Sequence, residues 1–164
     1  MNRIEGVSVR QLHAPSRAPE LFVLVQRAFA DLSIDPPSSV LRETTADIAA
    51  RIASDIALIA EASGALIGCV FCTPRPASLY VGRLAVRDEW RGQGVASALL
   101  AGAKDLARQL GLSRVELSTR IALTRNIRLF EAHGFEITAA QTHAGFAVPT
   151  SYDMTLTLAT GEVN

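Results

Sequence analysis

The amino-acid sequence predicts an α/β fold, in which helices cover a mixed β-sheet. Segments with strand-like and helix-like patterns follow one another along the whole chain, in the order β-α-α-β-β-β-α-β-α-β-β. The chain has 164 residues, of which 49% are hydrophobic and 20% charged, a composition typical of a folded globular protein. The sequence contains no repeat, low-complexity tract or linker, and a single domain is therefore expected.

The N-terminal third is expected to form one strand and two helices. Residues Val7–Leu12 alternate between apolar and polar side chains, which predicts a strand. Apolar residues then recur at helical spacing over Leu21–Phe29, before an Asp-Pro-Pro sequence that ends this helix. A second helix is expected after a cap at Thr44 or Thr45, because isoleucines recur at helical spacing beyond it.

The central third is expected to form three strands and the longest helix. Ile56–Ala60 and Ala65–Phe71 predict a β-hairpin about a Ser-Gly turn, and Leu79–Val86 predicts a further strand. The long helix is expected to begin near Gly94 and to end before Gly111, since glycine is a common helix stop. Its predicted apolar stripe consists of Val95, Leu99, Ala103, Leu106 and Leu110.

The C-terminal third is expected to complete the sheet. Arg114–Ser118 predicts a strand and Thr124–Ala132 a short helix. Two final strands are expected over Phe135–Gln141 and Tyr152–Leu158.

Charge and cysteine content argue against several classes of protein. The 16 basic and 16 acidic residues cancel, so nucleic-acid binding is not indicated. No run approaches the roughly 18 apolar residues of a membrane span, and Met1–Gly6 lacks the apolar segment of a secretory signal. Cys69 and Cys72 would face opposite sides of a strand, and the histidines show no paired metal spacing. A cytoplasmic protein without a metal, a nucleic-acid partner or a membrane partner is therefore expected.

The segment Arg91–Ser97 is the most informative part of the sequence. It reads Arg-Gly-Gln-Gly-Val-Ala-Ser, follows a predicted strand and opens the long helix. Free amides at a helix start, together with the positive end of the helix dipole, form an anion site, and glycines allow a phosphate to approach closely. Between Leu79 and Phe135, basic residues outnumber acidic residues by nine to five, which favours the same interpretation.

Three other interpretations of this segment fit the sequence less well. A simple turn into a helix would also use two glycines. A Walker loop requires Gly-Lys-Ser/Thr at its end, which is absent. A dinucleotide-binding fingerprint would have its third small residue only at Ser97, and it normally lies in the first βα unit of the chain.

The segment resembles motif A of the GCN5-related N-acetyltransferase (GNAT) family, whose pattern is Arg/Gln-x-x-Gly-x-Gly/Ala. Arg91, Gly94 and Ala96 occupy its three defining positions. The preceding Leu84-Ala85-Val86 resembles the end of the family's central strand, and Asn126–Phe135 resembles its Asn, Leu-Tyr, Gly-Phe run. The resemblance extends over nearly the whole chain and implies one GNAT domain over residues 7–159. Its fold would be a mixed, mostly antiparallel sheet, flanked by helices and splayed at the central strands.

The resemblance also implies a binding site for acetyl-CoA. The loop amides would hold the pyrophosphate, and the pantetheine arm would pair with the backbone of the central strand, whose N–H near Ala85 would polarise the thioester. Asn126 would either bond to the pantetheine or cap a helix. The residues implied to contact the co-substrate are Leu84, Ala85, Val86, Arg91, Gly92, Gln93, Gly94, Val95, Ala96, Ser97, Asn126 and Phe130.

The catalytic groups are the weakest part of the resemblance. The tyrosine that the family commonly uses to protonate the leaving thiolate is replaced by Phe130, which has no proton to give. Tyr152 and His133 are substitutes from elsewhere in the chain. The predicted central strand contains no acid, so Glu116 on the neighbouring strand is the candidate general base, although a salt-bridged strand residue is the competing interpretation.

The resemblance thus implies an acetyl-CoA-dependent N-acetyltransferase. An acetyl group would pass by direct attack to a primary amine of a small molecule or peptide that the sequence does not identify. The alternative is a non-catalytic module that binds acyl-CoA in a regulatory role, which the missing tyrosine and the acid-free central strand favour. Exposed sheet edges of this fold commonly pair, so a homodimer is compatible with the sequence.

Overall fold

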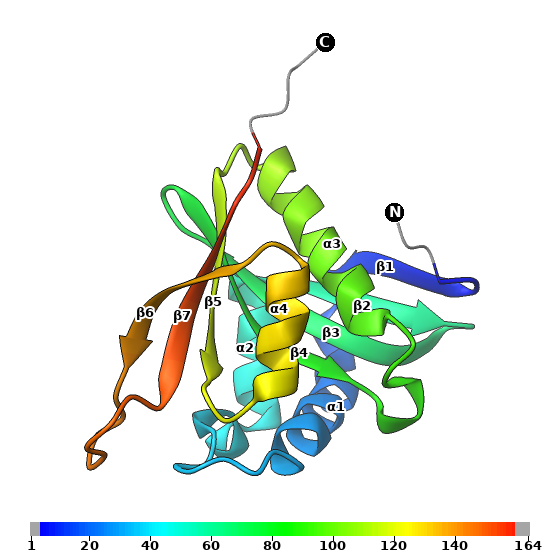
Figure 1. Ribbon diagram of the computed structural model, residues 1–164. Helices are drawn as coiled ribbons and strands as arrows, with labels where there is room; N and C mark the ends of the chain where they lie inside the picture. The colour runs from blue at the N-terminus through cyan, green and yellow to red at the C-terminus, as the bar shows by residue number, and fades with distance from the viewer. Residues whose placement is uncertain (1–3, 160–164) are drawn as a thin grey trace.

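The computed structural model describes residues 4–159, which form a seven-stranded mixed sheet with helices on both faces (Figure 1). The strands are β1 (Val7–Leu12), β2 (Ile56–Ala62), β3 (Ala65–Pro74), β4 (Ser78–Val86), β5 (Arg114–Arg120), β6 (Glu136–Gln141) and β7 (Ser151–Thr157). The helices are α1 (Ala18–Ala30), α2 (Thr45–Ser54), α3 (Val95–Gln109) and α4 (Thr124–Ala132). The element order is the one that the sequence predicts, apart from single-turn 3₁₀ segments, which periodicity does not resolve.

The sheet order is β1-β2-β3-β4-β5-β7-β6, and only the β4–β5 pair is parallel. The two-residue loop between β2 and β3 places Ala62 opposite Ala65, and both of its residues, Ser63 and Gly64, have positive φ. This is the backbone of a tight hairpin turn whose twist matches that of the strands. The predicted hairpin is therefore confirmed.

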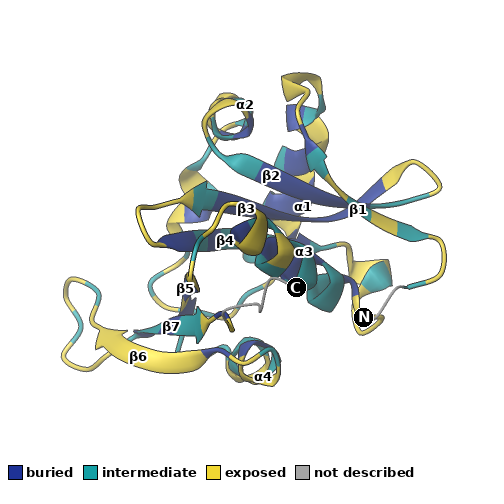
Figure 2. Ribbon diagram, turned by 90° about the horizontal axis from the view of Figure 1, so that it is seen from above, coloured by how far each residue is buried: buried dark blue, intermediate teal, exposed yellow. Residues whose placement is uncertain are grey.

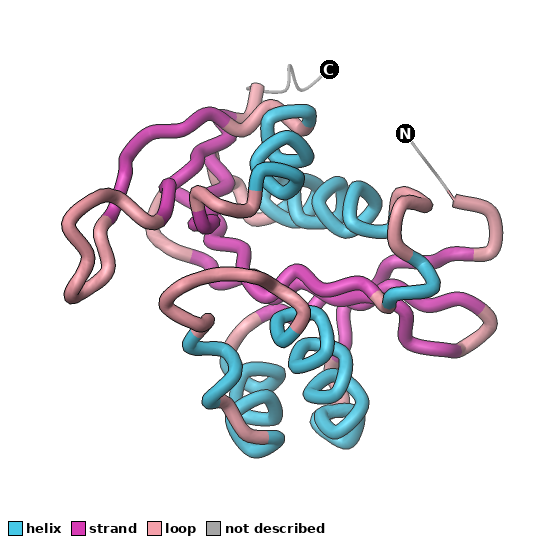
Figure 3. The backbone as a smooth tube through the Cα atoms, turned by 60° about the horizontal axis from the view of Figure 1, so that its bottom comes forward, coloured by secondary structure: helices cyan, strands magenta, loops and turns pink. Residues whose placement is uncertain are grey.

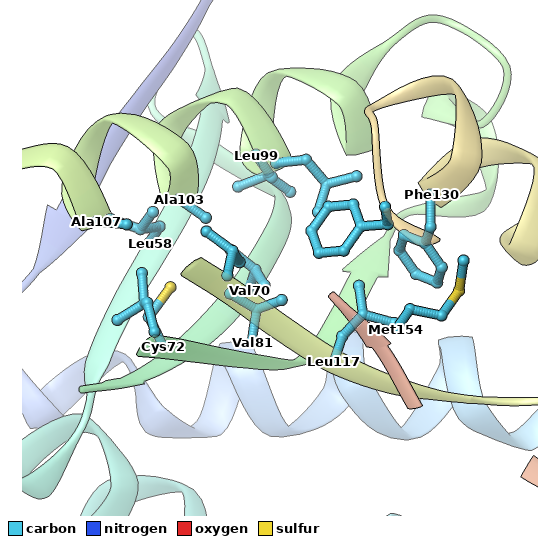
Figure 4. Close-up of a cluster of buried hydrophobic side chains, with 14 of the residues drawn as sticks. Leu58, Val70, Cys72, Val81, Leu99, Ala103, Ala107, Leu117, Phe130 and Met154 are labelled. Carbon is cyan, nitrogen blue, oxygen red and sulfur yellow. The ribbon is translucent and has the colours of Figure 1, made fainter. Parts of the chain in front are cut away.

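Helices α1 and α2 cover one face of the sheet, and α3 and α4 cover the other (Figure 3). Strand alternation divides the core between them, so that Leu58 faces α3 while Ile59 faces α1 and α2. Figure 4 shows the α3 side, where Leu99 and Ala103 lie over Val70. Figure 2 shows that β6, at the sheet edge, is exposed along its length.

Cys69 and Cys72 face opposite sides of the sheet, as their spacing predicts. Both are buried and free, and burial raises the pKa of each thiol to about 12. Both thiols therefore stay protonated near neutral pH and act as small core residues.

The ends of α3 differ slightly from the prediction. The helix begins at Val95, because Gly94 has a φ of 89° and serves as the N-cap. The buried face consists of Val95, Leu99, Leu100, Ala103 and Ala107. Leu110 is 45% exposed, because it forms the C-cap beyond the last helical residue instead of continuing the buried face.

Strands β4 and β5 separate after a short paired stretch. Ser78–Tyr80 of β4 pair with Arg114–Glu116 of β5, and beyond these residues the two strands diverge. The remainder of β4 still pairs with β3, and the remainder of β5 with β7. This confirms a sheet that is mixed, mostly antiparallel and splayed at its central strands.

Strand β4 also contains a β-bulge on its β3 side. Phe71 pairs with Gly82 and Cys69 with Ala85, so a single β3 residue faces both Arg83 and Leu84. Arg83 has a φ of 52°, a left-handed conformation that non-glycine residues rarely adopt within a strand. Such strain is typical of functional positions.

No helix among residues 4–159 is long and apolar enough to cross a membrane.

Candidate active site

A cleft of about 1010 Å³ opens where β4 and β5 diverge. One wall is formed by the second half of β4, the loop before α3 and the first turn of α3. The opposite wall is formed by the end of β5 and by α4, and the C-terminal end of α1 with the loop that follows it closes the far side. The fold thus converts a gap in the sheet into a cavity that reaches both helix layers.

Every residue expected to contact the co-substrate lies on this cleft except Gln93. The Gln93 side chain instead donates a hydrogen bond to the Glu89 carbonyl oxygen at 3.0 Å, within the loop. The sequence motifs, which lie up to 46 positions apart between Leu84 and Phe130, are therefore brought together at one site.

The loop before α3 presents a row of free backbone amides. Gly92 and Gly94 have φ values of 73° and 89°, which turn the chain into the helix. Within the described chain, the amides of residues 92–97 donate to no protein acceptor, and the first amide that does so is that of Ala98, to Gly94 at 3.0 Å. Unpaired amides at a helix start, with the positive end of the helix dipole, attract an anion.

Gly68 of β3 allows this helix start to lie close to the sheet. A Cβ at this position would lie 3.0 Å from Val95 Cγ1 and 3.1 Å from the Ala85 carbonyl oxygen. Any larger residue would therefore push the first turn of α3 away from β4. The glycine fixes the spacing between the amide row and the open edge of β4.

A hydrogen-bond chain orients the hydroxyl of Ser97 in the first turn of α3. The Lys104 ammonium contacts His133 Nδ1 at 3.2 Å, and His133 Nε2 contacts Ser97 Oγ at 3.0 Å. Because an ammonium only donates, Nδ1 accepts, so Nε2 carries the proton and donates to Ser97. The Ser97 hydroxyl then keeps its own proton for a ligand. Burial lowers the pKa of both His133 and Lys104, and the nearby ammonium lowers the pKa of His133 further.

Helix α4 contributes the two remaining cofactor-side residues. Asn126 and Phe130 both line the cleft, one turn apart on this helix. Phe130 is 7% exposed and packs edge-on against Phe135, with 6.0 Å between ring centroids. It therefore forms an apolar wall of the cleft and offers no hydroxyl group there.

The two predicted catalytic residues, Glu116 and Tyr152, are not on the cleft wall. Glu116 lies in the paired part of β5, where it accepts a hydrogen bond from Ser78 Oγ at 3.2 Å and lies 3.7 Å from Arg75 and 3.8 Å from Arg114. Tyr152 packs against the core beneath α3 and α4. Strand alternation explains its position, since its neighbour Ser151 lines the cleft instead.

Several cleft residues were not predicted by the sequence motifs. Ser118 and Arg120 extend from the diverging end of β5, and Arg83 extends from the bulge in β4. The Arg83 Nε donates to Glu43 Oε1 at 2.7 Å, and Arg51 donates to the other oxygen of Glu43 at 3.0 Å. No local motif marks these positions. The excess of basic residues between Leu79 and Phe135 was the sequence signal that pointed to a basic cleft wall.

The described residues that line the cleft include five arginines and His143 but no Asp or Glu. The lining therefore favours anionic groups and provides no carboxylate in direct contact with a ligand. A basic cleft with an apolar floor fits an elongated, negatively charged molecule.

A family model described as the acetyltransferase (GNAT) family matches residues 20–135, well over half of the chain. The chain belongs to the GNAT acetyltransferase family. The match contains the amide row, the central strand and the Asn126–Phe135 segment. The family predicted from the sequence motifs is thereby confirmed. A search of curated proteins found no match.

Solved GNAT structures show the same fold at low sequence identity. A GNAT acetyltransferase from Streptococcus pneumoniae is 19% identical, with a TM-score of 0.76 over 93% of this chain and 99% of that one. A GNAT acetyltransferase from Elizabethkingia anophelis with acetyl-CoA bound is 18% identical, with a TM-score of 0.71 over 94% and 100% of the two chains. The PaiA N-acetyltransferase from Thermoplasma acidophilum, in complex with coenzyme A, is 16% identical, with a TM-score of 0.77 over 93% and 99%.

Proposed function

We propose that this GNAT protein uses acetyl-CoA to acetylate a primary amine by direct attack within the cleft. The observation that carries the proposal is the row of unpaired amides at residues 92–97, which opens onto the same cavity as the diverging end of β4. A row of amides suits a pyrophosphate, and an open strand edge suits the amide-containing pantetheine arm. The acetyl-CoA and coenzyme A bound to two structural relatives support this proposal.

On this proposal, the co-substrate lies along β4 with its phosphates at the start of α3. The residues that hold it are Leu84, Ala85, Val86, Arg91, Gly92, Gln93, Gly94, Val95, Ala96, Ser97, Asn126 and Phe130, with Gln93 contributing its amide. The bulge at Arg83 changes the direction of the backbone just before Ala85, whose N–H would stabilise the developing oxyanion.

The proton acceptor proposed here is Asp153, acting through Ser118. Ser118 lines the cleft, and its Oγ donates to Asp153 Oδ1 at 2.8 Å, while Gln141 donates to Oδ2 at 3.0 Å. In the described chain no basic side chain lies within 4 Å of Asp153, whereas Glu116 lies between Arg75 and Arg114. Asp153 is therefore joined to the cleft through a neutral hydroxyl, whereas Glu116 is held by arginines outside it.

The reaction then balances without a further co-reactant. The amine lone pair attacks the thioester carbon, the C–S bond breaks, and the sulfur leaves as a thiolate with the bonding electrons. The proton of the attacking nitrogen passes to the Ser118 oxygen, while the Ser118 proton passes to Asp153. With Phe130 beside it, the thiolate leaves without a proton donor and takes its proton from water.

Calorimetric titration with acetyl-CoA tests the binding site, with NAD as the control ligand. We expect Gly94→Glu to abolish acetyl-CoA binding, because a carboxylate would occupy the anion site. Gly111→Glu is the matched control at the opposite end of α3, where the glycine also has a positive φ of 70° and open space around it. Equal affinity in Gly94→Glu and the wild type would show that the site is elsewhere.

The second candidate function is the non-catalytic acyl-CoA-binding module. Phe130 and the absence of a carboxylate from the described cleft lining favour it. An amine panel with acetyl-CoA, read by thiol release and by mass of the product, separates the two functions. Transfer above background that is lost in Gly94→Glu excludes the regulatory module, and binding without transfer to any amine supports it.

A further inference from the structure

Arg120 is the last residue of β5 and lies where the cleft meets the loop between α1 and α2. Its side chain lines the cleft, and Nη1 donates to the Pro36 carbonyl oxygen at 2.7 Å. It shares a face of β5 with Ser118, since residues two apart on a strand point the same way. This end of the cleft is therefore formed by side chains, whereas the other end is formed by the backbone amides of the amide row.

The charge of Arg120 is not neutralised by a contacting carboxylate. Among residues 4–159, no Asp or Glu oxygen lies within 4 Å of its guanidinium, and Asp35 acts on it only from farther away. Burial lowers the pKa of Arg120, so the site stabilises the positive charge less than water does. A partly buried cation of this kind gains from the arrival of an anion.

The other arginines on the cleft differ from Arg120. Arg83 is paired with Glu43 at 2.7 Å, and Arg91 lies 3.1 Å from Asp88. Arg125 and Arg128 belong to α4 and are exposed to solvent, on the side of the cleft that faces the amide row. Arg120 is thus the partly buried arginine of the cleft whose charge is available to a ligand at the acceptor end.

The hydrogen bond to the α1–α2 loop occupies only part of the donor capacity of the Arg120 guanidinium. The bond to Pro36 uses one of the five N–H donors of a guanidinium, which leaves the planar fork for two parallel bonds. The neighbouring cleft lining is polar at Ser38, Ser118 and Ser151 and apolar at Leu32 and Ile34. Such surroundings fit a small molecule with one anionic group and an apolar part.

We infer that the acceptor is a primary amine that also carries a carboxylate, and that Arg120 binds this carboxylate. The inference rests on the proposed function and adds the chemical class of its acceptor. The Cα atoms of Ser118 and Arg120 are about 7 Å apart along the strand. An amine delivered to Ser118 can thus share a molecule with a carboxylate held by Arg120, as in a free amino acid.

Matched acceptor pairs test this inference. Each amino acid is compared with its carboxamide, which keeps the side chain and the amine but removes the negative charge. Acetyl transfer is measured as kcat/KM, and calorimetry in the presence of coenzyme A measures binding of the corresponding N-acetyl acids and amides. We expect at least one acid to be used or bound ten times or more better than its amide. The amine of a carboxamide is less basic than that of the corresponding acid, so more of it is neutral and able to attack. This difference favours the carboxamide, so a measured preference for the acid does not arise from amine basicity.

Arg120→Gln should reduce the preference to near equality by raising KM for the acid, with little change for the amide. Arg120→Lys should retain part of the preference, since a point charge lacks the fork. Arg114→Gln, on the same strand outside the cleft, is the matched control and should behave like the wild type.

Two results would overturn the inference. One is that no acid is used or bound better than its amide, and the other is that Arg120→Gln lowers both members of each pair equally, as a purely structural residue would. Loss of acetyl-CoA binding by the wild type is a different failure, because it would refute the proposed function itself.

Discussion

The two ends of the cleft are formed by different chemical groups, backbone amides at one end and side chains at the other. At the start of α3, consecutive residues present backbone amides, a group that every residue except proline carries. At the acceptor end, side chains from β4, β5, the α1–α2 loop and the β6–β7 loop meet. A site made of main chain survives substitution as long as its turns form, whereas a site made of side chains changes with each replacement. One end can therefore stay constant while the other acquires a new acceptor.

The largest effect that would separate the two ends is expected at Ser118 and Asp153. Ser118→Ala and Asp153→Asn should each lower kcat about 100-fold or more, because each removes the route for the proton. Calorimetry should find acetyl-CoA affinity unchanged in both, since neither residue belongs to the amide row. Ser113→Ala, one residue before the same strand and with its hydroxyl bonded to the Ala77 carbonyl, should retain full activity. Equal rates in Ser118→Ala and the wild type would remove this pair from the mechanism.

A smaller effect, on acetyl-CoA binding and not on kcat, is expected at Ser97. Ser97→Ala should weaken acetyl-CoA binding roughly tenfold or more, because one hydrogen bond to a charged group contributes at least about 1.5 kcal/mol. His133→Phe should weaken it less, since the serine remains but is no longer oriented. If His133 acts through Ser97, the double variant should bind no more weakly than Ser97→Ala alone. Additive losses in the calorimetric titrations would contradict the hydrogen-bond chain.

The smallest effect concerns pH. Burial holds the pKa of His133 in the folded protein below its usual 6.5. Between these two pKa values, the unfolded chain binds more protons than the folded one. Stability conferred by the neutral ring is therefore complete above pH 6.5 and decreases as pH falls from there toward the folded-state pKa. Denaturant unfolding between pH 7.5 and 5.5 should show a small decline that His133→Phe lacks. An identical pH dependence in both proteins would contradict this sign.

The contrast between the two ends also explains what the sequence could predict. The amide row and the end of β4 lie within Leu84–Ser97, so their chemistry is readable from a contiguous pattern. Glu116 and Ser118 point to the same face of β5, and only the register shows that β4 covers the former and leaves the latter open. The contact between Arg120 and Pro36 joins residues 84 positions apart, and no periodicity carries that information. The bulge at Arg83 likewise depends on pairing with β3.

The divergence of β4 and β5 places two strand edges inside a sheet, where edges are ordinarily absent. Such edges invite pairing with any extended peptide and are a common route to aggregation. Three features oppose this here, since the bulge at Arg83 interrupts the regular ladder, Arg83 and Arg120 add charge, and α4 restricts approach from one side. The molecule thus keeps an opening wide enough for a narrow, amide-bearing ligand while discouraging a second polypeptide from completing its sheet.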